Sequence, residues 1–68
     1  MPVNDPDIWR AAKLVVDRHG EEAPIHAAQR ADELMAIGDT EGWEVWKRIS
    51  RAVDELLRAE PLPGERRH

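Results

Sequence analysis

The sequence contains no cysteine, tyrosine or phenylalanine among its 68 residues. Without cysteine, neither disulfide bonds nor thiolate metal ligands can staple so short a domain. The side-chain hydroxyls are limited to Thr40 and Ser50, and no glycine-rich phosphate loop, dinucleotide fingerprint or Gly-x-Ser-x-Gly motif is present. A chain of this length also has little room to enclose a substrate. The sequence therefore predicts that the protein is not an enzyme and needs no cofactor or metal.

Long apolar runs are missing as well, and neither sign of charge dominates. No run approaches the ~20 apolar residues of a transmembrane helix, and the first residues lack the basic-then-apolar pattern of a signal peptide. We therefore expect a cytoplasmic protein without membrane contact. Ten basic and fourteen acidic side chains leave a net charge of −4. This balance argues against nucleic acid as the partner, unless the basic residues gather on one face.

What the sequence does contain is three short amphipathic segments separated by cap and turn residues. Asp5 and Pro6 have the pattern of an N-cap followed by the first helical position. Gly20 and the Gly38-Asp39 pair follow the first and second segments, and Gly42 is a further break in the pattern. These signals predict an all-α, compact three-helix domain over residues 1–60 with a short flexible tail over 61–68. The helices are expected at about 6–19, 24–37 and 40–59.

Each predicted helix has an apolar stripe at helical spacing. The first stripe comprises Ile8, Trp9, Ala11, Ala12, Val15 and Val16. The second comprises Ala27, Ala28, Ala31, Leu34 and Met35. The third comprises Trp43, Trp46, Ile49, Val53, Leu56 and Leu57, widened by Val45 and Ala52. Because the third stripe covers roughly half of the helix circumference, we expect this helix to contact both others, or one of them and a partner chain.

The surplus of apolar residues suggests a surface for binding a protein. Trp46 is expected in the core, whereas Trp43 lies at the margin of its stripe, and Leu14 and Ile25 lie off their stripes. The leading prediction is a non-catalytic protein-interaction or regulatory module, whose partner is another protein or a second copy of the chain in a homodimer. Its predicted contact residues are Leu14, Ile25, Trp43, Val45 and Leu57.

Two alternatives belong to other classes of function. A basic strip along the third helix would serve a small nucleic-acid-binding regulator, and it consists of Lys47, Arg48, Arg51 and Arg58. Glu44, Asp54 and Glu55 are interleaved with this strip and bring it close to neutral. A metal-responsive protein would use His19, Glu22 and His26, although the sequence contains no His-x-x-His or His-x-x-x-His pair.

The stretch from Ile8 to Leu57 resembles a family of small uncharacterised proteins from alphaproteobacteria. The resemblance depends on an early tryptophan, a His-Gly helix end, an alanine-rich second helix and a glycine–aspartate corner with a tryptophan eight residues later. The residues concerned are Trp9, His19-Gly20, Gly38-Asp39-Thr40-Glu41-Gly42, Trp46-Lys47-Arg48-Ile49 and Leu56. It implies a cytoplasmic helical domain of unknown function and adds no catalytic or binding residue.

Overall fold

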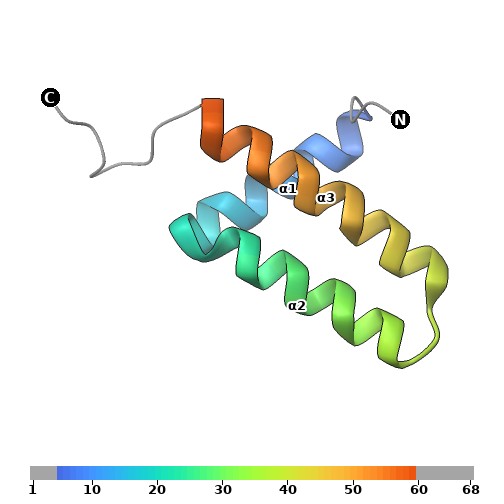
Figure 1. Cartoon of the computed structure of the whole chain (residues 1–68). Coiled ribbons are helices and arrows are strands. Elements are labelled where there is room, and N and C mark those ends of the chain that lie inside the picture. Colours follow the sequence, from blue (N-terminus) through green and yellow to red (C-terminus); the bar gives the residue numbers. More distant parts are fainter. Residues whose placement is uncertain (1–4, 60–68) are drawn as a thin grey trace, which may run out of the picture.

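The computed structural model describes residues 5–59, which form three α-helices (Figure 1). Helix α1 spans Pro6–His19, α2 spans Ala23–Ala36 and α3 spans Thr40–Ala59, with a 3₁₀ turn, η1, at Gly20–Glu22. The predicted all-α, three-helix fold is confirmed, and each helix boundary lies within one residue of its expected position. The tail predicted for residues 61–68 lies outside the described residues.

The N-terminus of α1 has the predicted cap. Asp5 is extended and its Oδ1 accepts a hydrogen bond of 2.9 Å from the backbone N–H of Asp7. Pro6 occupies the first helical position, where its missing N–H leaves no hydrogen bond unmade. The Asp7 carboxylate lies at the positive end of the helix dipole. The start of α1 is therefore determined by three consecutive residues.

The connection between α1 and α2 begins at Gly20 with a positive φ of 57° and a ψ of −125°. This ψ lies outside the left-handed helical region that a glycine after a helix usually adopts. The chain continues into the 3₁₀ turn η1 rather than a loop, and Pro24 then takes its predicted place in the first turn of α2. Gly20 therefore changes the direction of the chain within a very short connection.

The corner between α2 and α3 is a Schellman motif that leads directly into an N-cap. Gly38, with φ of 81°, donates its N–H to Met35 O at 3.0 Å, and the Asp39 N–H bonds Leu34 O at 2.9 Å. The Asp39 Oδ1 also accepts from the Gly42 N–H at 2.9 Å. One residue thus closes α2 and opens α3. Gly42 lies inside the first turn of α3, within the helix expected at 40–59, and therefore does not break the chain there.

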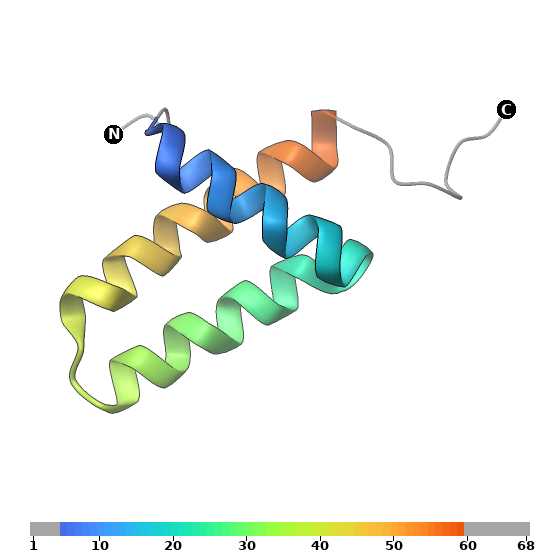
Figure 2. The same ribbon diagram turned by 180° about the vertical axis from the view of Figure 1, so that it is seen from behind.

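Helices α2 and α3 form an antiparallel hairpin, and α1 crosses α3 on one side of it (Figure 2). A cluster of alanine and β-branched side chains fills the junction of the three helices. Its buried members are Ile8, Ala12, Val15, Ala23, Ile49, Ala52 and Val53. Trp9 and Trp46 pack against this cluster and are half-buried. Trp46 thus contacts the core as expected, and both tryptophans lie at its margin rather than its centre.

Helix α2 buries a narrower stripe than the sequence predicted. Ala27, Ala31 and Leu34 are buried as expected, whereas Ala28 and Met35 are exposed, Met35 by 45%. The assignment of Ala28 and Met35 to the buried stripe was therefore wrong. Its cause is the number of neighbours: α3 runs along the whole length of α2, while α1 reaches only the N-terminal part (Figure 2). A helix with one neighbour over most of its length buries a single row of side chains.

Candidate interaction surface

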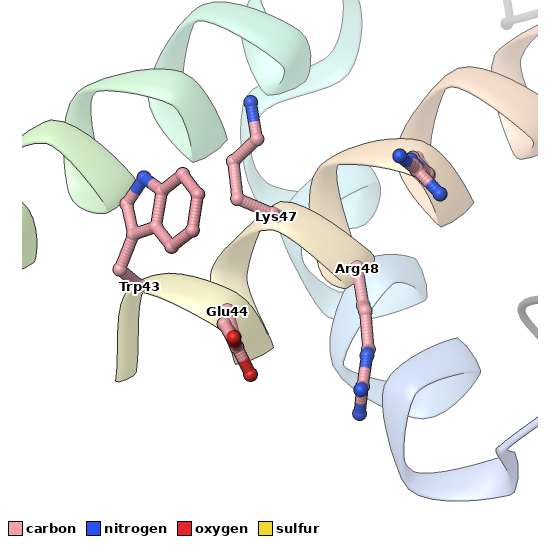
Figure 3. Close-up of a pocket in the computed structure, with 5 residues that line it drawn as sticks. Trp43, Glu44, Lys47 and Arg48 are labelled. Carbon is pink, nitrogen blue, oxygen red and sulfur yellow. The ribbon is translucent and has the colours of Figure 1, made fainter. Parts of the chain in front are cut away.

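The exposed side of α3 carries a shallow hollow (Figure 3). We call it the α3 hollow, and its lining residues are Trp43, Glu44, Lys47, Arg48 and Arg51. A single helix can supply all of them because side chains four residues apart lie one turn above each other. The volume of about 260 Å³ lies below the ~300–1,000 Å³ of typical small-molecule pockets. The hollow therefore suits one or two side chains of a partner protein better than an enclosed ligand.

Trp43 and Lys47 form the aromatic part of the α3 hollow. The Lys47 Nζ lies 5.8 Å from the centroid of the half-buried Trp43 ring, which is within the range of a cation–π contact. Trp43 packs outside the core cluster that Trp9 and Trp46 border. Figure 3 shows Trp43 and Lys47 on one side of α3, with Glu44 and Arg48 extending toward the other. The hollow consequently presents an indole ring and an ammonium group together.

The charges around the α3 hollow are unbalanced. Between residues 5 and 59, side-chain ion pairs join Arg10 to Asp7 at 3.4 Å, Arg30 to Glu33 at 3.0 Å and Arg58 to Glu55 at 3.0 Å. None of these pairs involves a cation of the hollow. Three cationic side chains there face one carboxylate, that of Glu44. The hollow is therefore a local positive site on a chain whose net charge is −4, and it would attract an acidic group.

A second candidate surface is the N-terminal continuation of the α3 apolar stripe. Val45, Ile49 and Ala52 lie in one line because they are separated by four and three residues. Ile49 is 4% exposed and Ala52 is fully buried, whereas Val45 is 42% exposed. The buried members pack with residues of α1, and the hairpin extends beyond α1 at its corner end (Figure 2). The apolar stripe thus continues past the helix that covers it.

The predicted contact residues are distributed over three helices. Leu14 and Ile25 are each more than half exposed on the outer sides of α1 and α2, two positions away from the fully buried Ala12 and Ala23. Trp43 lies in the α3 hollow and Val45 on the exposed stripe. Leu57 is half-buried and packs against the core cluster. Which of the five residues touch a partner stays a prediction.

Among the described residues, the most exposed large apolar side chain is that of Ile37, at 76%, and it was not among the predicted contact residues. Ile37 is the C-terminal cap residue of α2 and immediately precedes Gly38. The side of α2 on which Ile37 lies could be predicted from the sequence. Ile37 follows His26 by eleven residues, or three full turns, so both lie on the same side of the helix. Since His26 contacts the last residue of α1, Ile37 lies on the α1 side of the hairpin, at the corner end.

The basic strip divides in two in the structure. Lys47, Arg48 and Arg51 gather at the α3 hollow, whereas Arg58 lies farther along α3 and donates to Glu55 Oε2 at 3.0 Å. The strip therefore does not act as one continuous row of free cations. Its binding to nucleic acid stays a prediction.

The two internal histidines do come together. The rings of His19 and His26 stack with centroids 3.8 Å apart and an interplanar angle of 20°. Stacked rings direct their nitrogens sideways, not toward a shared point between them. Within residues 5–59, no group of three or more histidine, aspartate or glutamate side chains is arranged to hold a metal ion. Of the expected ligands His19, Glu22 and His26, the structure brings the two histidines into contact. Metal binding stays a prediction.

In a comparison with known families, residues 4–60 match the Family of unknown function (DUF6961). The chain belongs to this family. The expected membership of an uncharacterised helical family is confirmed, and its alphaproteobacterial origin stays a prediction. Neither the curated proteins nor the solved structures contain a match to this DUF6961 chain. None of the helices in the described part of the chain has the length and apolar character to cross a membrane.

Proposed function

We propose that this DUF6961 protein is a non-catalytic interaction module that binds an acidic segment of a partner protein at the α3 hollow, in the cytoplasm. The observation that carries the proposal is the composition of the hollow. A half-buried tryptophan lies beside three cationic side chains that form none of the ion pairs described between residues 5 and 59. Tryptophan and arginine are the residues most enriched among the energetically dominant contacts of protein interfaces.

The geometry supports a protein segment as the occupant. The hollow is open and lies on one helix, so a ligand bound there stays largely in contact with water. Exposed charge pairs contribute little individually, about 0–1 kcal/mol each. Affinity therefore requires an apolar contact in addition, and Trp43 provides one beside Lys47. A segment that combines carboxylates with an apolar or aromatic side chain matches both features.

The non-catalytic part of the proposal is supported by the core. Among the described residues, the buried side chains are all apolar. Ionisable groups acquire unusual reactivity mainly where burial and close charges shift their pKa values. The described charged side chains of this protein lie at the surface instead, in contact with water, which suits recognition better than acid–base chemistry.

Site-specific photo-crosslinking in cells tests the proposal. A photoreactive amino acid replaces Lys47 in the hollow or, as the matched control, Lys13 on the exposed side of α1. We expect protein adducts from position 47 that are lost when Trp43→Ala or Arg51→Glu is added, because each change removes part of the recognition surface. Equal adducts from positions 47 and 13, or no adducts from position 47, would contradict the proposal. An adduct with nucleic acid at position 47 would favour the alternative function.

A further inference from the structure

A second surface, which shares only Arg48 with the α3 hollow, lies where the apolar stripe of α3 leaves the core. The apolar stripe of α3 passes from the buried Ala52 and Ile49 to Val45, which is 42% exposed. Ile37, the C-cap residue of α2, is 76% exposed, and its spacing of eleven residues from His26 places it on the same side of the hairpin. Both positions belong to the corner end, which extends beyond α1 (Figure 2). Two large apolar side chains thus continue the face on which α1 packs.

The charges beside Val45 indicate what covers this face. Glu41 precedes Val45 by four residues and Arg48 follows it by three, so all three lie on one line along α3. Glu41 and Arg48 carry opposite charges, and neither takes part in the ion pairs described for residues 5–59. Figure 3 shows Arg48 extending away from Trp43 and Lys47, out of the aromatic part of the hollow. We call Glu41, Val45 and Arg48 the free stripe.

The free stripe is complementary to itself in one orientation. When two copies of a helix pair antiparallel about an axis, residues before the axis in one copy face residues after it in the other. An axis at Val45 places Glu41 of each copy against Arg48 of the second copy. A parallel arrangement would instead bring Glu41 against Glu41 and Arg48 against Arg48, which is repulsive. Complementary charges of this kind select orientation more than they add affinity.

We propose that the chain forms a homodimer through antiparallel pairing of two free stripes. Val45 of each copy lies at the two-fold axis, with Ile37 at the edge of the contact and a Glu41–Arg48 ion pair on each side. The interface is isologous, as in most homodimers. Two large apolar side chains per copy bury less area than the ~1,200 Å² of a standard interface. The dimer is therefore weak and depends on protein concentration.

Charge reversal on the free stripe tests this pairing in sedimentation equilibrium, from about 10 μM to about 1 mM chain. Glu41→Arg or Arg48→Glu alone creates two like-charged pairs, and we expect each to weaken dimerisation by about tenfold or more. The double variant E41R/R48E restores opposite charges across the axis and should recover the dimer. Asp54→Arg is the matched control, because Asp54 lies nine residues from Val45, on the opposite side of α3, and should leave dimerisation unchanged.

Val45→Glu supplies an independent measurement, with circular dichroism to show that the helices persist. We expect a monomer at every concentration, because two carboxylates would meet at the axis. A wild-type chain that is monomeric throughout overturns the proposal. A double variant that stays as weak as the single variants overturns the antiparallel pairing. Crosslinking from position 47 in the Val45→Glu variant separates the two proposals. If the protein adducts persist in this variant, the α3 hollow binds its partner without the dimer.

Discussion

The two ends of α3 differ although one apolar stripe runs through both. At the packed end, α1 crosses α3 and buries Ile49, Ala52 and Val53. At the corner end, the same stripe reaches Val45 and is exposed because α1 does not extend there. Burial in this protein is thus decided by how many helices meet at a point, not by the sequence pattern of one helix. The corner end is where the chain has surface available for other molecules.

The largest expected difference in stability is between a variant with a carboxylate at the packed end of α3 and one with a carboxylate at the corner end. Val53→Asp puts a carboxylate where the side chain is fully buried and should cost about 3 kcal/mol or more. Val45→Asp places the same charge at the corner end and should change stability by about 0.5 kcal/mol or less. Urea denaturation followed by circular dichroism, at chain concentrations below dimerisation, measures both. Similar losses for the two variants would show that the ends are equally buried.

The two positive-φ glycines allow a second comparison, between the connections at either end. A Cβ at Gly20 or Gly38 would meet no atom within 4 Å, so an alanine there costs conformational energy rather than a clash. Gly38→Ala should lower stability by about 1–2 kcal/mol. Gly20→Ala should lower it by about 2–3 kcal/mol, because a ψ of −125° at positive φ is avoided by residues with a side chain. The ranking of the two melting temperatures checks this expectation, and the reverse order would contradict it.

The smallest expected effect on stability comes from Gly42→Ala, next to the corner between α2 and α3. Gly→Ala inside a helix usually stabilises by about 0.5–1 kcal/mol. At Gly42 the new Cβ would lie 2.7 Å from Asp39 Oδ2, so the carboxylate must turn and weaken its bond to the Gly42 N–H. We expect Gly42→Ala to be near neutral in the wild type and stabilising once Asp39→Ala has removed the cap. A double-mutant cycle measures this coupling, and additive effects would show that Asp39 moves aside without loss.

The local features of the fold could be predicted from the sequence because each depends on a few neighbouring residues. The cap at Asp5, the position of Pro6 and the Gly38-Asp39 corner all follow from side-chain and backbone chemistry within one turn. The spacing places Met35 and Ile37 on their sides of α2, but whether a neighbouring helix covers those sides could not be predicted in the same way. It depends on where α1 crosses the hairpin, and several packings bury the same stripes.

The candidate surface was predictable in part. The row of Trp43, Lys47 and Arg51 follows from i, i+4 spacing, and the sequence identified its members, although it assigned the cations and the tryptophan to different functions. Their combination in one hollow required knowledge of the side-chain directions. The exposure of Val45 required the position of α1 once more. In both cases, the sequence did not determine how the helices pack against one another.

The shared cap at Asp39 also bears on how the chain folds. Because α2 and α3 are joined by a corner in which one residue ends one helix and begins the other, bringing them together closes a very short loop and costs little chain entropy. Contacts between neighbouring segments form faster than contacts between distant ones. The connection between α1 and α2 is equally short, but α1 packs mainly on α3, which lies farther along the chain. We therefore expect the α2–α3 hairpin to form first and α1 to dock onto it afterwards. Folding would then begin at the corner end, the same end at which Val45 and Ile37 stay exposed in the folded protein.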